Sequence, residues 1–242
     1  MDRALFAAAS GMAAQQRNLD TISDNLANSE VAGFKGSAQT FAALAAPGEH
    51  SMGTVALGEH LLFTQGKLER SNGPFDMAID GPGFFVVRDG ARIGYTRDGE
   101  FSRAADGTLR TSSGWHLDGV NVPDDAVSAK VAEDGTLTIT TAAGAARKLG
   151  KISVVDFPAP DGLTSVGGTL FTANASSGLA RPVHLGSHGA AQIRFGMLEH
   201  SNVSIVESMM QILAAQRAYE ANAKGVQAAD EMLRIANNLQ RG

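Results

Sequence analysis

Residues 5–26 read LFAAASGMAAQQRNLDTISDNL, and residues 205–233 read IVESMMQILAAQRAYEANAKGVQAADEML. Both stretches repeat apolar side chains every seven residues. The amino-terminal series is Leu5, Met12, Leu19 and Leu26, and the carboxy-terminal series is Ile205, Ile212, Tyr219, Val226 and Leu233. A seven-residue apolar repeat keeps one stripe of a helix against a partner helix. We therefore predict a helix at each end of the chain and expect the stripes to pair with each other or with neighbouring copies.

The residues around these stripes favour two uninterrupted helices. No proline precedes Pro47 or follows Pro182, so neither stretch contains a helix breaker. Asn28 is a poor residue for a helix interior and Gly33 is a natural stop, so the first helix should end near residue 28. Because small residues dominate both stripes, an isolated pair of helices would bury little surface and would gain from further copies.

The composition excludes several classes of function. The chain has 242 residues and a formal net charge of −5, without the basic footprint of a nucleic-acid-binding protein. It has no cysteine, which excludes disulfides and thiol chemistry. The first residues imitate a signal peptide, but the seven-residue repeat continues past any cleavage point, so we expect no cleaved signal. No stretch has the length of a transmembrane helix.

The middle of the chain carries turn signals instead of helical ones. Seven Asp-Gly pairs favour tight turns: Asp80-Gly81, Asp89-Gly90, Asp98-Gly99, Asp106-Gly107, Asp118-Gly119, Asp134-Gly135 and Asp161-Gly162. Short runs rich in β-forming residues lie between them, at 84–87, 108–111, 136–140 and 152–155. This alternation predicts a compact antiparallel β domain.

The predicted fold class is therefore α+β. The amino- and carboxy-terminal helices would form a paired, coiled-coil-like inner domain, joined to a central antiparallel β-rich domain. We assign residues 1–46 and 200–242 to the helical domain, 47–60 to a linker or loop, and 61–199 to the β domain. The linker is inferred from Pro47 and the glycines that follow it.

Three shorter segments carry more specific expectations. Residues 40–46 are rich in alanine and are expected to add a further helical turn or two. Residues 193–198 resemble one last strand of the β domain. Ser201-Asn202 supplies capping chemistry for the final helix.

Patterns that would indicate a metal site are weak. His184 and His188 have the spacing of two ligands on one helix face. The glycines at 186 and 189 disfavour a helix there, and no carboxylate stands at a suitable spacing. We predict neither a metal site nor a cofactor.

Patterns that would indicate catalysis are also weak. Paired acids such as Asp98 with Glu100, or Asp124 with Asp125, could perform glycoside hydrolysis. These acids lie in turns or polar loops, where hydration is the default, and Trp115 is the only tryptophan for a sugar platform. We predict that the chain is not an enzyme and has no catalytic residues.

Three blocks of sequence carry recognisable motifs. The amino-terminal block comprises residues 10–16 (SGMAAQQ), 22–28 (ISDNLAN) and 33–35 (GFK). The central block comprises residues 64–68 (TQGKL), 76–85 (DMAIDGPGFF) and 95–101 (YTRDGEF). The carboxy-terminal block comprises residues 201–203 (SNV), 216–220 (QRAYE) and 230–233 (DEML). Together they resemble the signatures of the bacterial flagellar rod and hook protein family, in the family's order and over nearly the whole chain.

The resemblance implies a structural subunit of the flagellar basal-body rod, which spans the periplasm. The terminal helices would line a narrow export channel and the β domain would lie outside them. Subunits would be exported unfolded, without a cleaved signal peptide, and would build a hollow helical shaft that transmits torque. The implied partners are copies of the chain, other rod proteins (FlgB, FlgC and FlgG-like subunits) and the flagellar type III export apparatus, with no nucleic acid and no small-molecule substrate.

Within the family, the opening residues 1–4 (MDRA) and the total length resemble the proximal rod member. The distal rod member is the alternative; it typically carries an extra stretch in the region that corresponds to residues 41–61. An alternative of a different class is a secreted β-domain adhesin or binding module with helical tethers.

We predict an assembly interface on the terminal segments, with Asn25, Asn28, Gly33 and Phe34 fixing the exit turn from the first helix. Its members are Leu5, Met12, Leu19, Ile22, Asn25, Leu26, Asn28, Gly33, Phe34, Ile205, Met209, Ile212, Arg217, Tyr219, Val226 and Leu233.

Overall fold

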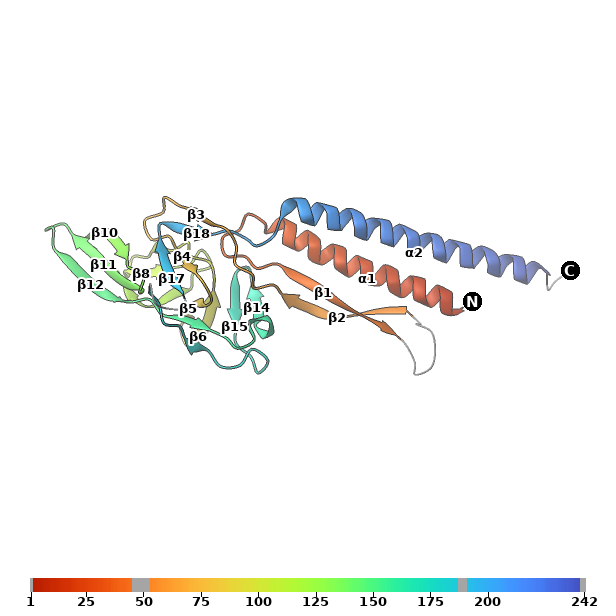
Figure 1. Cartoon of the computed structure of the whole chain (residues 1–242), viewed down its shortest axis with the longest axis horizontal. Coiled ribbons are helices and arrows are strands. Elements are labelled where there is room, and N and C mark those ends of the chain that lie inside the picture. The colour runs from red at the N-terminus through yellow and green to blue at the C-terminus, as the bar shows by residue number, and fades with distance from the viewer. Residues whose placement is uncertain (1, 45–52, 187–190, 240–242) are drawn as a thin grey trace. The chain divides into compact units, whose positions relative to one another are not determined.

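The computed structural model describes residues 2–44, 53–186 and 191–239, and it has an α+β fold (Figure 1). An amino-terminal helix and a carboxy-terminal helix flank a central region of antiparallel strands. The contacts divide the chain into two units. Unit 1 comprises residues 1–27, 37–60 and 203–242, and unit 2 comprises residues 28–36 and 61–202.

Unit 1 is built on two long helices, as the seven-residue repeats predict. Helix α1 spans Asp2–Ala27 and helix α2 spans Ile205–Leu239. The two helices pack against each other (Figure 1). Gly11 lets them approach closely, because a Cβ atom there would lie 2.9 Å from the Asn222 amide nitrogen. Helix α1 ends one residue before Asn28, close to the expected stop.

The cap of α2 differs from the expectation. Its first turn is capped by Ser204, whose carbonyl accepts the Ser208 N–H at 2.9 Å and whose hydroxyl accepts the Glu207 N–H at 3.4 Å. The Ser201-Asn202 pair lies before this cap, so its assignment as the capping pair is wrong. Asn202 makes its hydrogen bonds within unit 2 instead.

Strands β1 (Ser37–Leu44) and β2 (Gly53–Leu61) form a two-stranded sheet in unit 1. Two expectations were therefore wrong: residues 40–44 are strand and not helix, and residues 53–60 are strand and not linker. Side chains of α1 explain the difference, since the Asn25 amide bonds both the N–H and the carbonyl of Ser37, at 2.9 and 2.7 Å. Composition alone does not reveal a strand that is held by a neighbouring helix.

Unit 2 contains the remaining strands, and its named strand pairs are antiparallel. They are β3 (Leu68–Arg70), β4 (Met77–Asp80), β5 (Phe84–Asp89), β6 (Arg92–Thr96), β7 (Ser102–Arg103), β8 (Thr108–Arg110), β9 (His116–Asn121), β10 (Ala126–Val131), β11 (Thr136–Thr141), β12 (Ala146–Lys151), β13 (Val154–Asp156), β14 (Thr164–Gly167), β15 (Leu170–Thr172), β16 (Arg181–Pro182), β17 (Gln192–Phe195) and β18 (Met197–Glu199).

The largest sheet has the order β14-β15-β6-β5-β9-β8-β7, with β13 joining β5 to β16. A separate three-stranded sheet has the order β10-β11-β12. Two further pairs, β17 with β4 and β18 with β3, join the end of unit 2 to its beginning. The single strand expected at residues 193–198 is therefore two strands, separated at Gly196, whose φ is +71°.

The Asp-Gly pairs behave as predicted at three sharp turns, where Gly90, Gly107 and Gly135 have φ values of +60°, +83° and +85°. Asp118-Gly119 lies inside β9, and Asp161-Gly162 lies in the 3-10 turn Pro160–Gly162. Asp98-Gly99 lies in neither a turn nor a strand. The turn propensity of Asp-Gly is local, and strand pairing overrides it at Asp118-Gly119.

The main core of unit 2 is apolar and continuous across its sheets. It includes Met77 and Ile79 of β4, Phe85 of β5, and Ile193 of β17. A second cluster holds Phe84, Phe157 and Phe171, whose rings meet edge to face. The strands that close unit 2 thus contribute to the same core as the strands of the large sheet.

Gly99 provides a test of this packing. A Cβ atom at this position would lie 1.5 Å from the Met77 carbonyl oxygen, so we expect Gly99→Ala to lower the free energy of unfolding by about 3 kcal/mol or more. Gly90→Asn is the control, because Gly90 has a φ of +60° with open space around it and asparagine tolerates that conformation. Urea unfolding midpoints of both variants would check this, and equal midpoints would contradict the packing.

Candidate functional site

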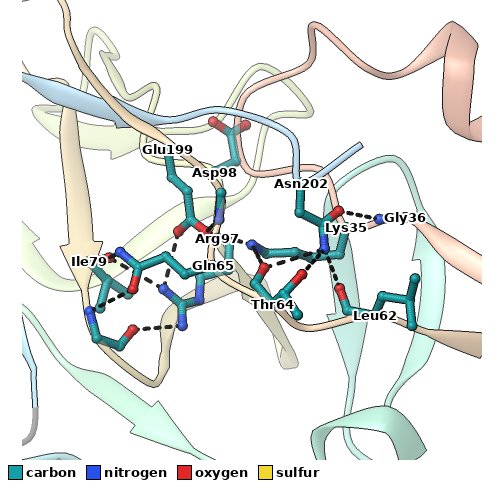
Figure 2. Close-up of polar contacts among 12 residues, drawn as sticks. Lys35, Gly36, Leu62, Thr64, Gln65, Ile79, Arg97, Asp98, Glu199 and Asn202 are labelled. Carbon is teal, nitrogen blue, oxygen red and sulfur yellow. Dashed lines mark hydrogen bonds and ion pairs between the residues drawn. The ribbon is translucent and has the colours of Figure 1, made fainter. Parts of the chain in front are cut away.

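Each motif block contributes at least one residue to a set of polar residues in unit 2, which we call the polar hub: Lys35, Thr64, Arg97, Glu199 and Asn202 (Figure 2). Lys35, Arg97 and Glu199 are its buried members. Lys35 comes from the loop after α1, Thr64 follows β2, and Arg97 follows β6. Glu199 ends β18, and Asn202 follows it. Residues that are far apart in the chain therefore meet at one place.

Glu199 is the anion at the centre of the hub. Its side chain is fully buried, and its carboxylate accepts from the Lys35 ammonium at 2.5 Å and from the Arg97 guanidinium at 3.1 Å. The Gly66 N–H donates to the same carboxylate at 2.8 Å. The Glu199 backbone carbonyl also accepts the Gly33 N–H at 2.7 Å. One residue thus holds the loop after α1, the segment after β2 and the segment after β6.

Both cations are almost completely buried and have several partners. Lys35 donates a second hydrogen bond to the Thr64 carbonyl at 2.8 Å. Arg97 donates to the carbonyls of Ile79 and Gly81 at 3.4 and 2.8 Å, and its guanidinium lies 5.5 Å from the Phe84 ring centroid. Burial lowers the pKa of Lys35 and of Arg97, and the charge of Glu199 opposes this effect.

Asn202 joins three segments with one amide. Its side-chain oxygen accepts the Gly36 N–H at 2.8 Å. Its side-chain nitrogen donates to the Leu62 carbonyl at 2.6 Å and to the Thr64 hydroxyl at 2.9 Å (Figure 2). Gly36, Leu62 and Asn202 each lie where the chain passes between the two units. The hub therefore fixes, within unit 2, three places at which the chain enters or leaves it.

Two glycines permit this close arrangement. Gly33 has a φ of +69°, and a Cβ atom there would lie 2.2 Å from the Asp98 backbone nitrogen. A Cβ atom at Gly66 would lie 1.8 Å from the His200 carbonyl oxygen. Both positions accept no larger residue without displacing backbone, which gives a physical reason for the glycines in the GFK and TQGKL motifs.

Asp98 is a buried carboxyl beside the hub. Burial raises its pKa to about 6, although the Glu100 N–H donates to it at 2.9 Å and favours the charged form. The carboxylates of Glu100 and Asp76 raise the pKa further. Asp98 thus destabilises unit 2 when it is ionised.

The other acids that the sequence singled out are placed differently. Asp124 lies on the surface and pairs with Arg103. Across residues 2–44, 53–186 and 191–239, no group of three or more histidine, aspartate or glutamate side chains is placed to hold a metal ion. His188 of the histidine pair lies outside these residues. In the same part of the chain, neither helix combines the length and apolarity needed to cross a bilayer.

The predicted interface residues of the first segment lie in several environments. Ile22 and Gly33 are buried, whereas Leu5, Met12, Leu19, Leu26, Asn28 and Phe34 are partly buried. Asn25 holds β1 through Ser37. These positions therefore make contacts within the chain.

The second segment divides between two faces of α2. Its buried positions are Ser208, Ala215 and Ala229, a series offset by three residues from the predicted one. Ile212 and Val226 are partly buried, whereas Ile205, Met209, Arg217 and Tyr219 are exposed. The side chain of Leu233 lies outside the described part of the structure. Helix α2 thus buries small residues and leaves large apolar ones uncovered.

The uncovered residues form a patch at the start of α2. We call it the α2 patch; it consists of Ile205, Val206, Met209, Met210 and Leu213, with exposed fractions of 42, 68, 54, 59 and 55%. Their spacing places them on one side of the helix. A contiguous patch of large exposed apolar side chains is typical of a surface that a partner covers.

Comparison with known proteins identifies the protein family to which this chain is similar. Three family models match: "Flagella basal body rod protein" over residues 5–35, "Flagellar hook protein FlgE/F/G D1 domain" over residues 78–139, and "Flagellar basal body rod FlgEFG protein C-terminal" over residues 195–239. The flagellar basal-body rod protein FlgG of Borreliella burgdorferi is 38% identical over 265 aligned positions, with both chains fully covered. FlgG of Bacillus subtilis is 33% identical over 264 positions, again with full coverage.

The chain belongs to the flagellar basal-body rod protein family. It is a structural protein of that rod, as its sequence motifs imply, and its relatives place the family in the flagellar basal body. Both of these relatives are named as flagellar basal-body rod proteins. An end-to-end match to rod proteins also disfavours the alternative of an adhesin.

The comparisons shift the balance between family members towards the alternative. The proximal rod protein is FlgF, and FlgF of Caulobacter vibrioides is 33% identical over 251 positions, covering 98% of this rod subunit and 97% of FlgF. The FlgG relative at 38% is more similar. The alignment with this FlgG extends over 265 positions, so the chain of 242 residues requires gaps in it. The findings therefore favour the FlgG alternative and leave the choice open.

The sequence analysis missed the polar hub, although each of its members lies in or beside a quoted motif. Lys35 ends the GFK motif and Arg97 lies in YTRDGEF, but nothing in these motifs indicates that their charges are buried. Glu199 stands outside every motif. A charged residue at the end of an apolar strand, as in residues 195–199 (FGMLE), is the one local signal that could have identified it.

Asp98 gives this rod subunit a pH dependence that can be tested. Because the pKa in the folded state is about 6 and the unfolded value is about 4, the folded carboxyl holds a proton that the unfolded chain has released between these pH values. Its contribution to stability is therefore present below about pH 4 and is lost as the pH rises through about 6.

We expect Asp98→Asn to raise the melting temperature at pH 7.5 and to flatten the change in stability between pH 4 and pH 6. The asparagine oxygen can still accept the Glu100 N–H. Thermal unfolding of both proteins across this pH range would measure the effect. A variant that is less stable than the parent at pH 7.5 would contradict the assignment.

Proposed function

We propose that this rod subunit is of the distal, FlgG kind. Copies would assemble with one another and with other rod proteins, including FlgB and FlgC, into a hollow helical shaft that lines the export channel and transmits torque. The observation that supports this most strongly is the end-to-end match to proteins named FlgG. The roles in transmitting torque and in lining the export channel are inferred from the family resemblance.

The α2 patch is the proposed assembly surface within unit 1. Full burial of a methionine, leucine, isoleucine or valine side chain stabilises by about 1.5–3 kcal/mol. Five such side chains, each 42–68% exposed, therefore offer of the order of 5 kcal/mol to a covering partner. The contact between α1 and α2 would extend into a coiled-coil-like inner domain once neighbouring copies cover this face.

The proposed route to the rod is the flagellar type III export apparatus, in an unfolded state and without a cleaved signal peptide. The support is that the residues of a would-be signal form part of α1, which packs on α2 and bonds β2 through Ser10. Cleavage after the alanines at 7–9 would remove a part of the helix that the folded subunit uses.

Substitutions in the α2 patch would test the assembly role. We expect Met209→Glu and Leu213→Glu to abolish rod formation and motility, because a carboxylate cannot be buried in an apolar contact without a partner. Both side chains are exposed in the subunit, so its free energy of unfolding should change by less than about 0.5 kcal/mol. Motility in soft agar, electron microscopy of basal bodies and urea unfolding would measure these effects.

Ala221→Glu is the matched control, because Ala221 is exposed on the same helix but lies outside the patch. It introduces the same charge and should leave motility intact. Ile212 is less suitable as a probe, because it is partly buried and a charge there would also disturb the subunit. If the Met209→Glu and Leu213→Glu proteins build normal rods, the α2 patch is not part of the assembly interface.

The second candidate, a proximal rod subunit, is favoured by the 33% identity to FlgF of Caulobacter vibrioides. Location in the rod separates the two. We expect cryo-electron microscopy of basal bodies to place the subunit in the distal part of the rod. Density in the proximal part would establish the FlgF role instead.

A further inference from the structure

The last residues of unit 2 are its closing segment, defined here as residues 192–202. Strand β17 pairs with β4, from Gln192 opposite Asp80 to Phe195 opposite Met77. Strand β18 pairs with β3, from Met197 opposite Arg70 to Glu199 opposite Leu68. The closing segment is therefore paired along most of its length with strands from the beginning of unit 2.

The buried charges of unit 2 depend on the same segment. Lys35 and Arg97 are both almost fully buried, and Glu199 is the carboxylate that pairs with each of them. Without Glu199, two buried cations would lose the carboxylate that pairs with them and would keep hydrogen bonds to carbonyl groups. A buried cation that loses its partner costs far more than an exposed one, because it has already lost its hydration. The Arg97 side chain also has a buried Nε atom without a hydrogen-bond partner, so it has little to replace a lost carboxylate.

The apolar core depends on the closing segment as well. Ile193 is fully enclosed in the core cluster that contains Met77, Ile79 and Phe85. Its N–H donates to the Glu133 carbonyl, and the Gly196 N–H donates to the Asp76 carbonyl at 2.7 Å. Removing the segment would expose one side of this core and leave β4 without its partner strand.

We propose that the closing segment is a folding latch: unit 2 reaches its native state only when residues 192–202 dock, and it opens as a whole when they leave. The latch is set by Glu199, which pairs with Lys35 and Arg97, and by Asn202, which holds Gly36 and Leu62. Because Lys35 and Glu199 are separated by 164 positions in the chain, the latch cannot form until nearly all of unit 2 has been made available.

The latch goes beyond the proposed function. The contacts on which the latch rests lie within unit 2 and do not depend on that function. Any state in which the closing segment is held elsewhere would keep unit 2 open and its core strands unpaired. A chain that leaves a channel with its amino terminus first would be in such a state until residue 202 had emerged. Premature closure of unit 2 would then be prevented by the order of the sequence itself.

Native-state hydrogen exchange on the full-length chain tests the latch directly. If the closing segment opens together with unit 2, the most protected amides of β17 and β18 should exchange through the same opening reaction as those of β4, β5 and β9, with the same denaturant dependence. If β17 and β18 open in a separate, smaller reaction while β5 and β9 stay protected, the latch is disproved.

Glu199→Gln gives the second measurement, because it keeps the shape of the side chain and removes its charge. We expect protection factors in β4, β5 and β9 to fall by about 100-fold or more, with those of α1 and α2 unchanged. Asp124→Asn is the matched control: Asp124 is an exposed carboxylate of unit 2 that pairs with Arg103, outside the closing segment. Its protection factors should change less than about 3-fold.

Asn202→Ala covers the case in which Glu199→Gln does not fold. It removes the amide that holds Gly36, Leu62 and Thr64 but leaves the buried ion pairs in place. The latch predicts a uniform loss of protection throughout unit 2, of about 10-fold or more. A loss confined to amides next to residue 202 would mean that the contacts are local and would overturn the proposal.

Discussion

Glu199 carries its charge in the interior of unit 2, between the ammonium of Lys35 and the guanidinium of Arg97. Transfer of each of these groups from water costs several kcal/mol, and only their close mutual contacts offset that cost. The two cations therefore depend on the same anion: removal of Glu199 would leave both Lys35 and Arg97 without the carboxylate that pairs with them. The chain segments that carry these groups are brought together by this requirement, and the Asn202 amide completes the arrangement.

The two units satisfy different physical demands. Unit 2 has a continuous apolar core, edge-to-face phenylalanines and a closed network of buried polar groups, so its stability is internal. Unit 1 consists of two long helices and a two-stranded sheet, and its buried positions on α2 are small. Such a helix pair gains little from its own packing, whereas the α2 patch leaves apolar surface for neighbours. A rod protein needs both properties, since each subunit must be a defined object and must also bind others of its kind.

Local sequence patterns predicted those features that depend on local interactions. The seven-residue repeats identified α1 and α2, because helical periodicity is a property of neighbouring residues. Asp-Gly identified the turns at Gly90, Gly107 and Gly135, where no strand competes. The same reasoning failed at Asp98-Gly99, where Met77 pairs with the Gly99 backbone, and at β1, where Asn25 of α1 holds the strand. The buried positions of α2 lie three residues after the predicted ones, because α2 buries small side chains such as Ala215 in place of the large apolar ones.

The sequence by itself determined the α+β class, the helical ends and, through its motifs, membership of the rod family. Only the tertiary structure decided that Lys35, Arg97 and Glu199 share one buried site, that Asn202 joins segments instead of capping a helix, and that residues 192–202 close unit 2. The physical reason is that periodicity and turn propensity are set by residues within a few positions of each other. Whether a charge is buried depends on groups up to 164 positions away in the chain, and a local sequence pattern contains no information about such distant groups.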